Sequence, residues 1–297
     1  MATTVSGLSE YVFNHRDELI TKASLDAKTL RYVEIMPNVK WKDALNFLDS
    51  TITLQDGGSC GFNPTGSDLF REKYIETNPI KIEKEWCFKD WEKSFANYQL
   101  MWTAGRVSIP FEETIVDSNL AKIQEAVEDL VWKGSASLNV EGFISGITYT
   151  ESASTIEVSG LTSASTIVEK IDAVVAAIPQ KALKKGVYVF LSYSDLRAYI
   201  LAQNAVCCAN RQIQDAAVEE LKYVGDSRVT LVPVYGLEGT GYIVAAPADA
   251  LVWATDVENA SNEYRVWENE EDEKVRFRVL FRGGTAIKYP DEVVFAK

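Results

Sequence analysis

The sequence predicts an α+β fold, because helical and strand patterns occupy separate stretches of the chain. Residues 110–134 have the pattern of one long amphipathic helix, and residues 241–297 contain one strand pattern after another. Between them, residues 162–242 alternate helices with buried strands. Segregated helices and antiparallel strands are typical of α+β proteins, and 297 residues suffice for one elaborated domain or two fused lobes.

Composition and charge narrow the possible functions. With 46% hydrophobic and 25% charged residues, the chain has the composition of an ordered soluble protein. A net charge of -13 disfavours nucleic-acid binding as the main function, since affinity for phosphate depends on Lys and Arg. It is compatible with a container that holds DNA without adhering to it. The N-terminus lacks a signal-peptide centre and the apolar runs are too short to span a membrane, so we expect a cytoplasmic protein.

Residues 1–49 are predicted to form an N-terminal arm. Short apolar groups alternate there with charges, no single period covers them all, and Pro37 interrupts the pattern. We therefore expect short helical pieces that pack against something else. His15, the only histidine, lies among polar residues and is predicted to be solvated, with no catalytic role.

Residues 50–103 are predicted to leave the body of the protein as a two-stranded ribbon. A turn-rich run at residues 55–68 precedes residues 70–88, where apolar and charged side chains alternate around Pro79. An isolated ribbon of two strands is only marginally stable in water. This one should therefore lie on its own domain in a monomer, or on a neighbouring subunit in an assembly.

The helix predicted at residues 110–134 organises the rest of the chain. Pro110 precedes it, acidic residues fill its first turns and Gly134 follows its last apolar residue, as helix ends favour. Its apolar positions form one narrow stripe: Val116, Leu120, Ile123, Val127, Leu130 and Val131. Its predicted polar face consists of Asp117, Lys122, Gln124, Glu125 and Glu128. A helix with one thin apolar stripe needs only one layer beneath it, which suits a flat subunit better than an enzyme core.

Residues 162–242 are predicted to form a compact α/β lobe, with a Ser/Thr-rich boundary at residues 152–166 before it. Ser163 or Ser165 can cap its first helix, and residues 187–192 have the continuous apolar pattern of a buried strand. The final strands follow this lobe. In residues 274–282, apolar side chains alternate with basic ones, so one face should join the core and the basic face should contact acidic groups elsewhere.

No motif for catalysis or cofactor binding has the required spacing. The glycines at residues 236–241 follow neither phosphate-loop pattern, and a strand rather than a helix comes after them. Ser192, Ser194 and Asp195 lack a histidine partner outside the arm. The four cysteines lack C-x-x-C spacing, so we expect reduced thiols and no metal site. The sequence thus predicts no catalytic residue, no cofactor and no enzyme activity.

The order of these parts resembles a known family. The sequence W-K-G at residues 132–134, N-V-E-G-F at residues 139–143 and R-F-R-V-L-F-R-G-G-T-A-I-K-Y-P-D-E-V-V at residues 276–294 accompany the arm, the ribbon, the long helix and the inserted lobe. This arrangement resembles the major capsid protein of tailed bacteriophages, the Hong Kong 97-like fold that encapsulins share. The likeness covers nearly the whole chain and rests on arrangement, without catalytic chemistry.

The resemblance implies five structural parts. They are an N-terminal arm (1–49), an extended loop on the neighbouring subunit (50–103), a peripheral domain with the spine helix (104–155 and 243–297) and an axial domain (156–242) at five- and six-fold axes. The acidic turn at residues 268–274 would lie near three-fold axes. A fused scaffolding domain is expected to be absent. Covalent crosslinking through Lys73, Lys81 or Lys84 and Asn269 is not expected, because none of them lies in a recognisable motif.

The function implied is that of a major capsid protein. Identical subunits would assemble into pentamers and hexamers of an icosahedral head that encloses double-stranded DNA without sequence-specific binding. Other partners would be a portal and a separate scaffold or decoration proteins, with no membrane involved. The protein would reside in the virion after assembly in the host cytoplasm. The alternatives are an encapsulin-like compartment and, ranked lower, a soluble two-lobed α/β enzyme.

The site residues that we predict are contacts between subunits. Aromatic anchors dominate the energy of buried interfaces, and consecutive acids at an exposed turn are solvated unless a partner covers them. The predicted contacts are Trp41, Phe70, Arg71, Lys73, Tyr74, Trp86, Trp91, Glu270, Glu271, Asp272, Arg276 and Arg278.

Overall fold

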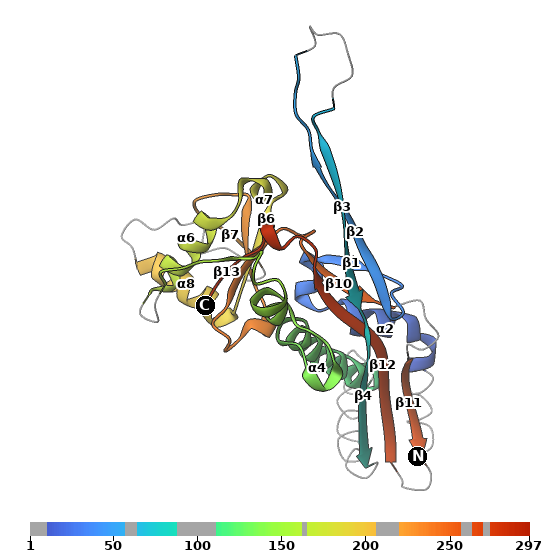
Figure 1. Cartoon of the computed structure of the whole chain (residues 1–297). Helices are drawn as coiled ribbons and strands as arrows, with labels where there is room; N and C mark the ends of the chain where they lie inside the picture. Colours follow the sequence, from blue (N-terminus) through green and yellow to red (C-terminus); the bar gives the residue numbers. More distant parts are fainter. Residues whose placement is uncertain are drawn as a thin grey trace.

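A computed structural model gives the architecture of most of the chain. It describes residues 11–56, 64–87, 111–161, 165–205, 220–256, 263–269 and 274–297. These residues form a five-stranded sheet, a six-stranded sheet and a two-stranded ribbon, with one long helix running between the two larger sheets (Figure 1). The α+β class predicted from the sequence is confirmed.

The long helix α4 (Phe111–Lys133) lies where the sequence predicts it. Its apolar stripe is buried from Val116 to Val131, and Trp132 at its end is fully buried between Phe143 and Phe190. The prediction of its polar face is wrong at Glu128, which is 5% exposed. The helix thus contributes a buried carboxylate as well as a hydrophobic stripe.

The five-stranded sheet is covered on one face and charged on the other. It has the order β1 (Glu34–Met36), β10 (Leu251–Thr255), β12 (Lys274–Ile287) and β11 (Glu263–Asn269), and β4 (Asn78–Cys87) also pairs with β12. Along β12 the apolar residues Val275 to Phe281 are buried at every second position, in one core with α4 and α2 (Arg16–Leu25). The alternation predicted for this strand is therefore confirmed.

The six-stranded sheet and its helices form the second unit, here called the six-stranded lobe. Its strands are β5 (Ile156–Glu157), β13 (Val294–Ala296), β9 (Ile243–Ala246), β6 (Val187–Leu191), β8 (Val229–Pro233) and β7 (Leu221–Lys222), in that order. Its helices are α6 (Ile167–Ala177), α7 (Gln180–Lys185) and α8 (Tyr193–Ala205). Because β9 and β13 pair within this sheet, the predicted domain boundary after residue 242 falls inside it.

Local hydrogen bonds explain where the helices of this lobe begin. Thr166 caps α6 through a capping box with Glu169, in place of the predicted Ser165, and Ser163 lies outside the described residues. The Ser192 hydroxyl accepts from the Asp195 N–H at 3.0 Å and donates to the Asp195 carboxylate at 2.7 Å. These two residues therefore cap the start of α8.

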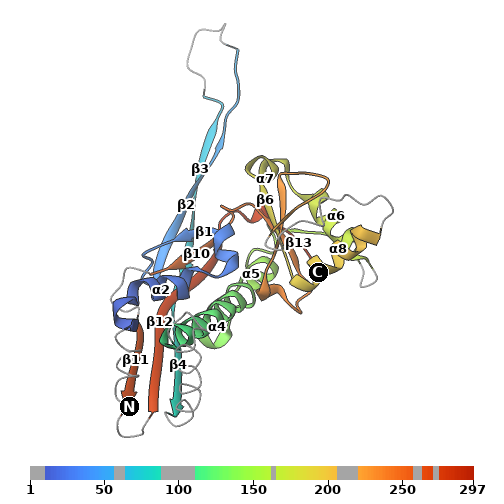
Figure 2. The same ribbon diagram turned by 180° about the vertical axis from the view of Figure 1, so that it is seen from behind.

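The two-stranded ribbon pairs β2 (Lys42–Thr51) with β3 (Ser67–Glu76) and projects far from the rest of the molecule (Figures 1 and 2). The sequence predicted the second strand of this ribbon further along the chain, in the stretch that forms β4. That stretch instead joins the five-stranded sheet, because it buries Ile80 there. Thr77 fixes the turn between β3 and β4: its N–H donates to the Trp41 carbonyl at 2.8 Å. Pro79 is tolerated because β12 is the one partner of β4 among the described strands, which leaves β4 at an edge of the described sheet.

The remaining elements are short turns that join these units. They are η1 (Lys28–Tyr32), η2 (Ala136–Leu138), α5 (Phe143–Ser145), η3 (Gly146–Thr150), η5 (Tyr235–Leu237) and η6 (Pro290–Glu292). At η5, a Cβ on Gly236 would lie 2.4 Å from the Glu128 carbonyl oxygen, so glycine lets this turn approach α4. The predicted turn before the strand at β9 is therefore observed, and it packs against the long helix.

Candidate functional site

The outer part of the β2–β3 ribbon exposes large apolar side chains. Ile52 is 84% exposed, Leu54 94%, Leu69 53% and Phe70 81%. At the base, by contrast, Leu45 and Ile75 are buried against Val252 and Ala254 of β10. The ribbon is therefore anchored to its own chain at the base alone among the residues described, and its outer apolar surface contacts water.

Charged side chains fix the base of the ribbon to the body. The Lys73 ammonium lies 2.5 Å from the Glu151 carboxylate and donates to the Ile287 carbonyl at 2.8 Å. Lys42 bonds Glu76 at 2.8 Å and lies over the ring of Tyr74, 4.6 Å from its centroid. These contacts orient the strands where they leave the body.

The outer face of the five-stranded sheet carries a ladder of ion pairs. Arg278 of β12 pairs with Glu83 of β4 at 2.9 Å, and Lys274 pairs with Glu85 at 2.6 Å. Hydrogen bonds from Lys81 and Arg278 hold the pKa of Glu83 below its usual value. The acidic partners expected for the basic face of β12 are thus supplied by the neighbouring strand of the same chain.

Two aromatic residues stack with arginines near this ladder. Trp267 of β11 lies between Arg265 and Arg278, with its ring centroid 5.4 and 5.5 Å from the two guanidinium carbons. Trp41 is 67% exposed and lies 4.1 Å from the Arg282 guanidinium. Trp267 is half-buried, whereas an exposed aromatic ring backed by an arginine, as at Trp41, is typical of surfaces that bind another protein.

The structure divides the predicted contact residues into two groups. Phe70, Arg71, Lys73 and Tyr74 follow one another on β3, and the last two belong to its anchored end. Trp86, Arg276 and Arg278 lie on β4 and β12, with Trp86 half-buried against Phe277. The predicted contacts outside the described residues are Trp91, Glu270, Glu271 and Asp272.

Sequence reasoning missed several exposed residues of the ribbon. Ile52 and Leu54 lie in the stretch Thr-Ile-Thr-Leu, whose alternation is a strand signal. The predicted ribbon placed this stretch next to a turn-rich loop and assigned it no contact. Trp267 was missed too, because alternation alone does not show which face of a strand stays outside the core.

A buried carboxylate fastens the N-terminal segment to α4. Glu128 accepts hydrogen bonds from the Lys28 N–H at 3.2 Å, the Thr29 N–H at 3.3 Å and the Thr29 hydroxyl at 2.7 Å. The Trp132 indole also donates to the Thr29 hydroxyl at 2.7 Å. Burial raises the pKa of Glu128, while these donors act in the opposite direction. The cluster therefore holds the N-terminal segment against α4.

The described residues supply little for ligand chemistry. Among them, no group of three or more His, Cys, Asp or Glu side chains has the arrangement that holds a metal ion. A cavity of about 510 Å³ at the ribbon base is lined by Arg71, Lys73 and Glu151, the last two paired with each other.

The helices that the structure describes include none with the length and apolar character to cross a membrane.

Comparison with known proteins identifies the fold. A chain of the satellite phage P4 procapsid including size determination (Sid) protein aligns with TM-score 0.63 and 12% identity, covering 94% of this chain and 89% of that one. The capsid of the empty GTA particle aligns with TM-score 0.57 and 11% identity over 91% and 96%. The virus-like particle from Pyrococcus furiosus aligns with TM-score 0.53 and 11% identity over 94% and 98%. No protein-family model and no curated protein matches the sequence. The chain has the Hong Kong 97-like fold of phage capsid proteins.

Proposed function

We propose that the chain is a major capsid protein that assembles into pentamers and hexamers of an icosahedral phage head. The head would enclose double-stranded DNA, and the chain would act without catalysis. Residues 50–103 would be the extended loop, residues 104–155 and 243–297 the peripheral domain and residues 156–242 the axial domain, to whose sheet β9 and β13 of the last segment also belong. The ribbon itself begins earlier, at Lys42.

The observation that carries this proposal is the bare outer part of the β2–β3 ribbon. Two strands alone are marginally stable, and four large apolar side chains there are more than half exposed: Ile52, Leu54, Leu69 and Phe70. Burying such a side chain contributes roughly 1.5–3 kcal/mol. A second copy of the chain would supply the missing surface, and the fold is one found in assembled shells.

In the proposed mechanism, the free energies of many weak contacts between subunits add up. Association of two subunits loses translational and rotational freedom, which offsets much of the energy from one ribbon contact. In a closed shell every subunit both gives and receives a ribbon, so many modest contacts act together. Assembly therefore follows from repetition rather than from one strong interface.

The test is electron microscopy of the purified protein with a matched pair of variants. Wild type, alone or with a candidate scaffold, should form shells or rings. I52D/L54D should remain folded by circular dichroism but form no shells, because it places two charges in the buried contact. T53D adds a charge at the exposed residue between them and should still assemble. A strictly monomeric wild type, or shells of normal yield from I52D/L54D, would contradict the proposal.

An encapsulin-like compartment remains the alternative within the same fold. The fold also occurs in the virus-like particle from Pyrococcus furiosus, so it is not confined to particles named as phage heads. The contents of purified shells distinguish a phage head from a compartment. A phage head should release nuclease-sensitive DNA when it is opened, whereas a compartment should contain a cargo protein that mass spectrometry detects. A portal and scaffold or decoration proteins would co-purify in the first case. The lower-ranked hypothesis of a soluble two-lobed enzyme requires an active monomer.

A further inference from the structure

Besides its passage through α4, the chain crosses between the five-stranded sheet and the six-stranded lobe at two neighbouring places. Residues 247–250 connect β9 to β10, and residues 288–293 connect β12 to β13. The two crossings are bonded to each other, because the Lys288 N–H donates to the Ala250 carbonyl at 2.8 Å. A change in the angle between the sheet and the lobe has to pass through these segments.

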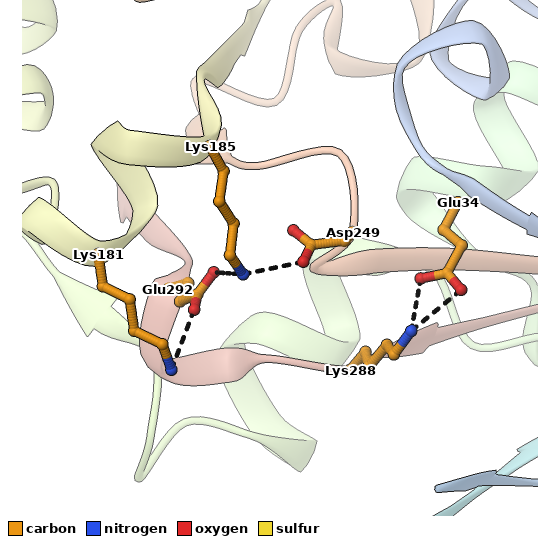
Figure 3. A network of polar contacts seen from close by, with 6 residues as sticks. All are labelled: Glu34, Lys181, Lys185, Asp249, Lys288 and Glu292. Atoms are coloured by element: carbon orange, nitrogen blue, oxygen red, sulfur yellow. Dashed lines mark hydrogen bonds and ion pairs between the residues drawn. The ribbon is translucent and has the colours of Figure 1, made fainter. Parts of the chain in front are cut away.

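One lysine of the lobe holds both crossings. Lys185, at the end of α7, bonds Asp249 of the first crossing at 2.8 Å and Glu292 of the second at 2.6 Å (Figure 3). Glu292 is 1% exposed and also pairs with Lys181 at 3.2 Å. Burial lowers the pKa of Lys185, but its bonds to the two carboxylates outweigh this and raise it. The lysine therefore stays charged while it bridges the two segments.

Tyr289 connects the same crossing to the ribbon. Its ring lies edge-on to Phe47 of β2, with centroids 5.6 Å apart, and the Lys185 ammonium lies over it at 4.8 Å. Just before it, the Ile287 carbonyl accepts a hydrogen bond from Lys73 of β3. On the other side, Lys288 pairs with Glu34 of β1 at 2.7 Å (Figure 3). Tyr289 thus touches the ribbon on one side and the lobe's lysine on the other.

We propose that Tyr289, Lys185 and Glu292 form a joint that couples the position of the β2–β3 ribbon to the orientation of the six-stranded lobe. Phe47 contacts Tyr289, and Tyr289 precedes the η6 turn that carries Glu292. Glu292 is held by Lys185 of α7. These contacts lie within one chain, so the inference does not depend on the function proposed above. Physical coupling of this kind requires a chain of packed and bonded groups, and here it is three residues long.

Hydrogen exchange on the full-length protein tests the joint. K185M keeps the length of the side chain and removes its charge. We expect exchange about tenfold faster in α7 and, as the signature of coupling, also in residues 42–47 of β2. K184M, a change at the exposed neighbouring lysine of α7, should leave both segments unchanged. V174A, which opens a cavity in the lobe's core, should speed exchange in the lobe but not in the ribbon.

Variants at Tyr289 identify the route. Y289F keeps the ring and should behave as wild type. Y289A should speed exchange in β2, and adding K185M to it should produce no further change there. The reverse direction gives a check that does not depend on the lobe's stability. F47A, in the ribbon, should speed exchange at the end of α7, because coupling between two sites is reciprocal.

Three results would overturn the joint. In the first, K185M speeds exchange in α7 and leaves residues 42–47 unchanged. In the second, V174A speeds exchange in β2 as much as K185M does, which means that general destabilisation explains the effect. In the third, F47A has no effect at α7. If K185M fails to fold, F47A and the comparison of Y289A with Y289F still decide whether the ribbon and the lobe are coupled.

Discussion

The β2–β3 ribbon and the six-stranded lobe use similar apolar residues in opposite ways. In the lobe, β9 is buried at all four positions and β6 at all but one. In the ribbon, β3 carries Leu69 and Phe70, yet Ile75 is its single buried residue. The apolar content of a strand alone thus does not indicate whether its side chains are buried in the chain's own core. In the lobe these side chains stabilise the chain's own fold, and on the outer part of the ribbon they are exposed to solvent.

Two phenylalanines give the strongest test of this contrast. F190A should destabilise the unassembled chain by about 3–5 kcal/mol, because Phe190 is fully buried against Trp132 and its loss leaves a cavity. F70A should change stability by less than about 0.5 kcal/mol, because Phe70 is 81% exposed. Urea unfolding of both variants measures the difference. Equal losses would show that the ribbon is part of the chain's own core.

In assembly, unlike in unfolding, Phe70 of the ribbon should have a large effect. If Phe70 is buried between subunits, F70A should raise the protein concentration needed for assembly roughly tenfold or more, in line with about 1.5–3 kcal/mol for a buried side chain. F70L, which keeps most of the apolar area, should assemble close to wild type. Light scattering against protein concentration measures this. An unchanged threshold in F70A would remove Phe70 from the interface.

Glu128 tests whether a buried charged group stabilises the fold, as the buried apolar side chains do. E128A should cost about 1–3 kcal/mol, because it leaves the Thr29 hydroxyl and two backbone N–H groups without an acceptor. E125Q, at a half-exposed position of the same helix, should cost much less. Denaturant unfolding compares the two variants, and similar losses would refute the role of Glu128 in holding the N-terminal segment.

The raised pKa of Glu128 adds a pH dependence with a defined sign. Folding favours the protonated form, so this contribution is fully present below the unfolded pKa near 4.5 and is lost as pH rises through the higher folded pKa. The stability of wild type relative to E128Q should therefore fall on going from pH 4 to neutral pH. A rise over the same interval would mean that the donors from residues 28 and 29 outweigh burial.

Much of this architecture could be predicted from local patterns. The stripe on α4, the alternation along β12 and the buried strand at β6 are periodic signals within one element. Strand pairing is not such a signal. The two halves of residues 70–88 both alternate, but β3 pairs with β2 and β4 pairs with β12, nearly two hundred residues later in the chain. Nothing in the alternation of β4 indicates that partner.

For the candidate interface and its surroundings, too, local patterns do not indicate partners that are distant in the sequence. Phe70 and Trp41 were predicted as contacts because aromatic anchors dominate the energy of interfaces, and both are exposed in the structure. Glu128 was assigned to a polar face because it lies opposite the apolar stripe, and its partners come from residues 28 and 29. Long-range hydrogen bonds of this kind leave no spacing in the sequence, so burial of a charged group was missed.

The smallest effect concerns an exposed ion pair of the lobe. Arg228 donates to Asp226 from Nε at 2.9 Å and from a terminal nitrogen at 2.5 Å, and these bonds lower the pKa of Asp226 to about 2. The pair's contribution is present above the unfolded pKa of 3.8 and is lost as pH falls through about 2. D226N should thus differ slightly from wild type at neutral pH, and the two should converge in strong acid. An NMR titration midpoint near pH 4 for Asp226 would contradict the pairing. It would show that this solvent-exposed contact, even within the well-packed lobe, contributes as little to stability as the exposed side chains of the ribbon do.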